Sequence, residues 1–117
     1  MLTPNNVRQQ LAKGRRNLFE LRINEDILPF LDEKDRRIQA NLIKNPRSLN
    51  AQEGHNDRMT KIMRKLERGR KNKINPITLL LHEDKNKYRI KSGSADLAAF
   101  MIKEQETIFV TIIKGRW

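Results

Sequence analysis

The sequence TIFVTIIKGRW, residues 107–117, contains the clearest predicted strand of the chain. Apolar residues occupy both alternating sets of positions until the first lysine. Strands that are covered on both sides have this pattern, so we predict a central strand buried on both faces. If Phe109, Thr111 and Ile113 face the helices, the lysine and arginine that follow lie on the opposite face.

Three segments before this strand have patterns that fit further strands. Residues 76–82 (PITLLLH) are an apolar run, and residues 87–91 (KYRIK) alternate, with Tyr88 and Ile90 on one face. Residues 95–103 (ADLAAFMIK) fit either a helix or a strand. Their alanines favour a helix, but the short turns on either side and the strand that follows favour a strand, which we predict.

The N-terminal half is predicted to form one strand and two helices. Residues 17–23 (NLFELRI) alternate as a strand does. Asp32 followed by Asp35 resembles a capping box for the first helix. The Asn-Pro pair at residues 45–46 ends that helix, because a residue before proline avoids the helical conformation.

The second helix is predicted from an apolar stripe at the i, i+3, i+4, i+7 spacing of a helix that buries one face. The stripe comprises Met59, Ile62, Met63 and Leu66. The helix runs from residue 52 or 56 to Arg68, and Gly69 suits its C-terminal cap. Basic side chains gather along one flank of the stripe, which leaves that flank available to a phosphate backbone.

These elements predict an α+β fold, in which an N-terminal strand and two helices pack on one face of a four- to five-stranded, mainly antiparallel sheet. Residues 17–117 form a single domain in this prediction. Residues 1–16 form a basic N-terminal arm with a short helix, capped by Thr3 and begun by Pro4. We expect the arm to contribute little to the core.

The charge of the chain indicates a polyanionic partner. Among 117 residues, 25 Lys and Arg against 14 Asp and Glu give a formal net charge of +11. RNA, DNA or the ribosome is therefore the expected partner. Without cysteine, and with two histidines far apart in sequence, the chain is predicted to hold no metal and no cofactor. It has no apolar run long enough to span a membrane and no signal-peptide core, so we expect a cytoplasmic protein without a membrane partner.

His55 and Arg58 are the first candidates for a catalytic site. Cleavage of RNA without a metal needs a general base, a general acid and cations for the charge that develops on the phosphate. His55 suits the acid or base, since histidine titrates near neutral pH. Arg58 suits the phosphate, since a guanidinium donates two parallel hydrogen bonds. The alternative is a partly buried histidine at a helix start beside a solvated arginine.

The predicted sheet supplies the other candidates. Arg89 points the same way as Lys87 and Lys91, so this strand either binds phosphate or faces solvent. Thr111 either orients a catalytic group or bonds the backbone. The predicted nucleic-acid-binding residues are Lys61, Lys65, Arg68, Arg70, Lys71, Lys73, Lys87, Lys91, Lys114 and Arg116.

Two further side chains have alternative roles. His82, at the end of an apolar strand, is either a second acid or base or a structural histidine. Trp117 either stacks on a base or covers the end of the sheet.

Parts of the chain resemble a group of small ribonucleases that includes barnase-like, EndoU-like, colicin-like and RelE-like toxins. NLFELRINEDILPFLDEKDRRIQANLIKNP is similar to the opening strand and helix of the RelE/ParE pattern. YRIKSG and IFVTIIKGR are similar to its closing strands, and GHNDRM resembles the histidine-arginine helix of phage RegB-type endoribonucleases. In RelE-type nucleases the strand after the YRIKSG-like segment usually carries a catalytic arginine, which DLAAFMI lacks.

The charge, the histidine and the resemblance together favour a metal-independent endoribonuclease of toxin or phage type. In this hypothesis His55 is the acid or base and Thr111 orients groups from the sheet. The phosphate is bound by Arg58, Arg89 and Lys91. The resemblance also implies an antitoxin or inhibitor protein as a partner. The alternatives are a non-catalytic RNA-, DNA- or ribosome-binding regulator and a ParE-like protein that binds a host enzyme.

Overall fold

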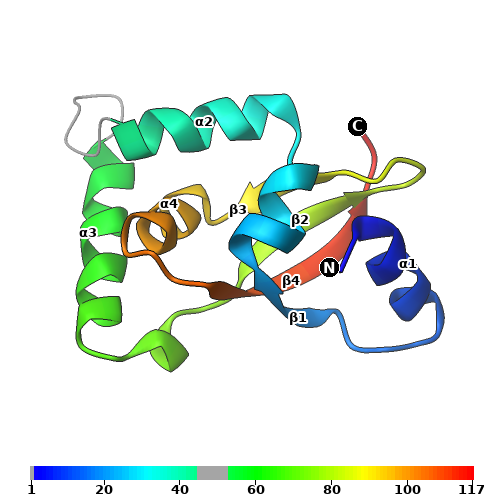
Figure 1. Ribbon diagram of the computed structural model, residues 1–117, viewed down its shortest axis with the longest axis horizontal. Helices are drawn as coiled ribbons and strands as arrows, with labels where there is room; N and C mark the ends of the chain where they lie inside the picture. The colour runs from blue at the N-terminus through cyan, green and yellow to red at the C-terminus, as the bar shows by residue number, and fades with distance from the viewer. Residues whose placement is uncertain (1, 45–52) are drawn as a thin grey trace.

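The computed structural model describes residues 2–44 and 53–117, without the side chains of residues 53–57. As predicted, the fold is α+β, with helices packed against a four-stranded sheet. The strands of this sheet are β1 (Leu18–Arg22), β2 (Ile77–His82), β3 (Tyr88–Ser92) and β4 (Thr107–Gly115). The α-helices are α1 (Pro4–Ala12), α2 (Glu33–Lys44), α3 (Glu53–Glu67) and α4 (Ser94–Ile102). Short helical turns include η1 (Ile23–Ile27), η2 (Leu28–Phe30) and η4 (Lys71–Lys73). Figure 1 shows α3 and α4 at one end of the sheet and α1 at the other.

The sheet is mixed, and its strand order is β1–β4–β2–β3. β1 pairs with β4 and β2 with β3 in antiparallel fashion, whereas β2 and β4 run parallel. The parallel pair arises because α4 carries the chain from β3 back past β2 before β4 begins, which is the crossover that parallel neighbours require. β4 is therefore a central strand, as predicted, but the sheet is not antiparallel throughout.

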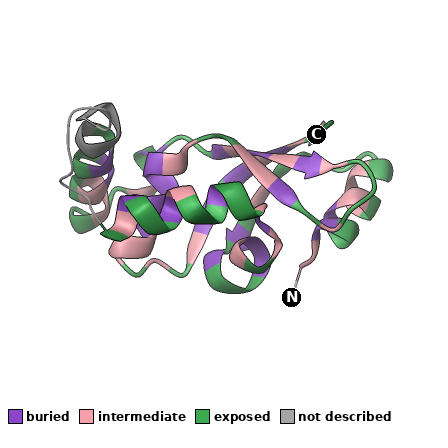
Figure 2. Ribbon diagram, turned by 90° about the horizontal axis from the view of Figure 1, so that it is seen from above, coloured by how far each residue is buried: buried purple, intermediate pink, exposed green. Residues whose placement is uncertain are grey.

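The helices cover one face of the sheet. Buried residues alternate with less buried ones along β2 and β4 (Figure 2). Strand register pairs Ile77 with Val110 and Leu79 with Ile112 on the covered side. The other side, which we call the open face, carries Leu18, Glu20, Thr78, Leu80, His82, Arg89, Phe109, Thr111 and Ile113.

The prediction that β4 is buried on both faces is wrong. The residues that face the helices are Ile108, Val110 and Ile112. The open face carries Phe109, Thr111 and Ile113, so the condition that these three residues face the helices is not met. Lys114 pairs with Leu81 and so lies on the covered side, not opposite it. The sequence pattern misleads here because an apolar residue on a strand reads the same whether or not a helix covers that face of the sheet.

Residues 95–103 belong largely to α4 and not to the predicted strand. Gly93 precedes this helix with a φ of +103°, and a Cβ there would lie 2.3 Å from Ile77 Cγ2, so the turn requires glycine. Ala95 and residues 97–100 are buried. A helix that is apolar nearly all round has no polar face, and its sequence lacks the period that separates helices from buried strands.

The N-terminal arm belongs to the core, contrary to expectation. Its helix begins as predicted, with Thr3 Oγ1 accepting a hydrogen bond from Asn6 N. Val7 is completely buried. The guanidinium of Arg8 donates to the carbonyls of His82 and Lys85, which fastens α1 to the turn between β2 and β3. This docking buries an apolar residue that the sequence alone left without a partner.

Asp35 protects the exposed edge of β3 and does not form the predicted capping box. It is 3% exposed, and its Oδ2 accepts a hydrogen bond of 2.9 Å from Ile90 N. The same oxygen lies 3.7 Å from Arg89 Nε. An edge strand presents unpaired backbone groups, and one of them is satisfied here by a carboxylate from the first turn of α2.

We predict that Asp35→Ala lowers the free energy of unfolding by about 1–3 kcal/mol, because it leaves a buried backbone N–H without an acceptor. Urea denaturation measures the change. The control is Glu33→Ala in the same helical turn, whose exposed carboxylate pairs only with Arg37. Its cost should stay below about 1 kcal/mol, and equal losses in both variants would contradict the assigned role of Asp35.

Candidate nucleic-acid interface

The basic flank of α3 forms a groove on the surface. The opposite side of this helix packs on the core through Met59 and Ile62, both 1% exposed, so the flank faces solvent as predicted. The helix ends before Gly69, whose φ of +68° fits the predicted cap. The groove has a volume of about 260 Å³, and its lining includes Arg58, Lys61, Arg64, Lys65, Arg68 and Arg70.

Most of these cations have no acidic partner. Among the residues that the structure describes, no carboxylate forms a salt bridge with Lys61, Arg64, Lys65, Arg68 or Arg70. Glu67 lies on the same helix, but its carboxylate bonds Lys103 Nζ. That contact lowers the pKa of Glu67, and the charges of Arg64 and Arg68 lower it further. The groove thus retains a concentrated positive charge.

Arg58 is the exception, because it is held by a buried carboxylate. Its Nε and Nη2 donate to the two oxygens of Asp96 at 2.9 and 3.1 Å. Asp96 is 4% exposed and lies in the first turn of α4. The hydrogen bonds and charge of this carboxylate raise the pKa of Arg58. Arg58, the predicted phosphate ligand, therefore serves mainly to link α3 to α4.

A second hollow brings Arg58 together with Lys91. It has a volume of about 470 Å³ and lies where β3 turns into α4, with Asn75, Ser92 and Ser94 among its lining residues. Because Arg58 lines both hollows, they form one surface. We call this surface the basic strip and define it by Arg58, Lys61, Arg64, Lys65, Arg68, Arg70 and Lys91.

His55 belongs to the same helix, one turn before Arg58. Its side chain lies outside the described residues, so its predicted role as acid or base has no geometry to support it here.

The structure does not bring Arg89 and Thr111, the catalytic candidates on the sheet, to the basic strip. Arg89 is directed to Asp35 at the first turn of α2. Thr111 lies on the open face, between Leu18 of β1 and Thr78 of β2. The four predicted catalytic residues thus occupy separate places wherever their side chains are described.

The remaining predicted nucleic-acid ligands differ in their contacts. Lys71 Nζ donates to Thr107 Oγ1 at 2.7 Å and lies 3.9 Å from Glu20 Oε2. Arg116 Nε lies 2.8 Å from Glu83 Oε1. Lys73, Lys87 and Lys114 are exposed.

His82 has a structural role. Its Nδ1 accepts hydrogen bonds of 3.0 Å from the backbone N–H groups of Asp84 and Lys85, which shapes the turn after β2. Its ring also packs edge-on against Trp117, with ring centroids 4.7 Å apart.

Sequence reasoning missed Arg64, the pairing of Asp96 with Arg58, and the burial of Asp35, which is one of three buried aspartates in the described part of the chain. Arg64 is three residues from Lys61, on the same side of the helix, so helical geometry could have found it. Asp96 stands alone in an apolar run, and a buried carboxylate in such a run needs a cation to pair with it. The sequence pattern does not predict that this cation is Arg58, which is far from Asp96 in the sequence.

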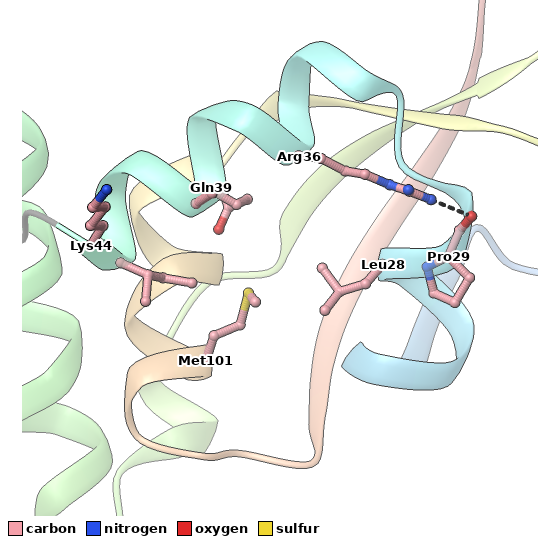
Figure 3. A pocket seen from close by; sticks show the side chains of 8 residues that line it. Leu28, Pro29, Arg36, Gln39, Lys44 and Met101 are labelled. Carbon is pink, nitrogen blue, oxygen red and sulfur yellow. Dashed lines mark hydrogen bonds between the residues drawn. The ribbon is translucent and has the colours of Figure 1, made fainter.

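A larger and more apolar pocket lies between η2, α2 and α4 (Figure 3). It has a volume of about 660 Å³, with Leu28, Ile43 and Met101 among its lining residues. Arg36 at its rim donates to the carbonyl of Pro29 at 2.7 Å. No residue of the basic strip lines this pocket, which makes it a separate feature of the surface.

Comparisons of the chain with protein-family models, with curated proteins and with solved structures found no match. Among the side chains of residues 2–44 and 58–117, no group of three or more histidines and carboxylates is placed to hold a metal ion. None of the helices in that part of the chain is long and apolar enough to cross a membrane. Function must therefore be argued from the surface itself.

We predict that Arg58→Met lowers the free energy of unfolding by about 1–3 kcal/mol, because it leaves the buried carboxylate of Asp96 unpaired. Arg58→Lys should restore only part of the loss, since an ammonium cannot form two parallel bonds. Thermal or urea denaturation measures both changes. The control is Lys61→Met, which should be nearly neutral, and a loss as large as that of Arg58→Met would argue against the link.

Proposed function

We propose that this protein binds RNA without cleaving it, with the phosphate backbone lying along the basic strip. The observation that carries the proposal is the groove of α3, where five cations that form no salt bridge with a described carboxylate line one hollow. Lys and Arg side chains in such a groove release condensed counterions when they bind phosphates, and this gives sequence-independent affinity. The net charge of +11 favours the same partner over any neutral or basic one.

The fixed geometry of the strip supports binding. The link from Arg58 to Asp96 holds α3 against α4, so the cations are displayed on a supported surface. A rigid array loses less conformational entropy when it binds than one that must first be ordered.

We predict that replacing Lys61, Lys65 and Arg68 together by glutamine weakens RNA binding and makes the dependence of log K on log salt shallower by about 2–3 units, because three phosphate contacts are lost. Fluorescence anisotropy with a labelled RNA across a series of KCl concentrations measures the slope. The matched control replaces Lys13, Arg15 and Lys34, three exposed cations outside the strip, by glutamine. An equal change in the control would mean that overall charge, and not the strip, binds RNA.

A second candidate function is metal-independent cleavage of RNA. It is supported by one observation: Arg58 and Lys91 line one pocket, and His55 precedes Arg58 by one turn of α3. A histidine is suited to proton transfer beside a phosphate that two cations bind. Cleavage ranks second because the guanidinium of Arg58 already bonds both carboxylate oxygens of Asp96. In addition, Arg89 and Thr111 lie away from the basic strip.

The cleavage hypothesis predicts that the wild-type protein cuts RNA in the presence of EDTA and that His55→Ala cuts it at least about 100-fold more slowly, as expected when a general acid or base is lost. Gel electrophoresis of end-labelled RNA measures the rate. Asn56→Ala is the control for a substitution in the same turn. Intact RNA with the wild-type protein, under conditions in which binding is observed, would reject cleavage and leave the binding proposal standing.

A further inference from the structure

The open face of the sheet is an apolar surface that helices leave uncovered. Leu18 is 47% exposed and Phe109 is 38% exposed. They belong to neighbouring strands, since Leu18 pairs with Thr111 and Glu20 with Phe109 in the register of β1 and β4. Leu80 and Ile113 are half-buried and pair with each other further along the same face. The apolar surface is therefore continuous and does not consist of scattered single residues.

The exposed aromatic residues are associated with this face. Phe109 lies on β4, and Trp117 follows the same strand and is 38% exposed. The ring of Trp117 contacts His82, which lies on the open face at the end of β2. Aromatic rings that remain accessible on a sheet are suited to stacking with planar groups such as nucleobases.

Cations connect this face to the basic strip at two places. Lys71 follows Arg70 of the strip, and its Nζ reaches Thr107, two residues before Phe109 on the same side of β4. At the other edge, Lys91 of the strip lies two residues beyond Arg89 of the open face. The carboxylate of Glu20, next to Phe109, accepts a hydrogen bond from Thr107 and lies near Lys71, which offsets its charge.

Two hydroxyl groups lie between the apolar residues. Thr78 and Thr111 are register partners on β2 and β4, and both are half-buried on the open face. In the described structure their hydroxyls have no hydrogen-bond partner. A ribose 2′-hydroxyl both donates and accepts hydrogen bonds, and it distinguishes RNA from DNA.

We propose that the open face binds the bases of single-stranded RNA, which stack on Phe109 and Trp117, while the phosphates at the Phe109 end reach Lys71 and the basic strip. The inference rests on the proposed function and specifies the form of RNA that is bound. A duplex keeps its bases stacked within the helix, so it cannot use the aromatic rings. A second copy of the chain is a poorer occupant of the face, because two protomers that each carry a charge of +11 repel one another.

The experiment uses Trp117, the single tryptophan of the chain, as an intrinsic reporter. Intrinsic fluorescence is titrated with single-stranded RNA, with single-stranded DNA of the same sequence and with an RNA duplex. We expect the fluorescence to be quenched and the affinity to be highest with single-stranded RNA. Unchanged fluorescence at saturation, preference for the duplex or tighter binding of DNA would overturn the inference.

Variants at Phe109 separate stacking from general apolar contact. Phe109→Leu keeps an apolar side chain but loses the aromatic ring, and it should weaken binding about 5- to 150-fold. Phe109→Tyr keeps a ring and should bind as the wild-type protein does. Circular dichroism verifies that both variants fold. Equal affinity of Phe109→Leu and the wild-type protein would overturn the inference.

Two results distinguish a failure of base binding by the open face from a failure of RNA binding as a whole. If Phe109→Leu binds normally while the triple variant of the strip loses affinity, RNA binding stands and its assignment to the open face fails. If neither single strands nor duplexes bind, the proposed function fails as well. Sedimentation velocity tests whether a second copy of the chain covers the open face instead. A dimer that Phe109→Leu dissociates would identify the face as a contact between copies and overturn the inference.

Discussion

The bidentate ion pair between Arg58 and Asp96 links α3, which carries most of the basic strip, to the buried helix α4. A carboxylate in the apolar environment of α4 is costly unless a cation compensates it. In this structure α3 provides that cation while its apolar stripe packs on the core and its basic flank faces outward. The charged contact and the apolar stripe together hold the helix in the orientation that brings the cations of the basic strip together.

Much of the fold could be predicted from the sequence, because period and caps are local properties. The capped start of α1, the alternation of β1 and the stripe of α3 each depend on residues a few positions apart. The failures concern contacts between distant residues. α4 was expected to be a strand because a helix buried on all sides loses its period, and α1 was expected to be an arm because nothing in its sequence reveals the turn that Arg8 binds.

The candidate site was predictable in composition but not in arrangement. The basic flank of α3 follows from helical geometry alone, so most of its residues were identified. Arg58 was identified for its guanidinium, but a buried partner in a distant helix determines what that group does. Thr111 and Phe109 were expected to face the helices, because alternation separates two faces without saying which one is covered. The sequence states the chemistry of each side chain, whereas tertiary packing determines which face of the sheet the helices cover.

The pairing of β1 with β4 also constrains how the chain can fold as it is synthesised. β1 is near the beginning of the described chain, and its partner Thr107–Gly115 comes near the end. During translation β1 therefore cannot pair with β4 until residues 107–115 have emerged, and α1 cannot dock until the turn that it binds has emerged. Such long-range pairing slows folding and leaves apolar segments exposed in the interval. The nascent chain is therefore most vulnerable to aggregation before its last strand leaves the ribosome.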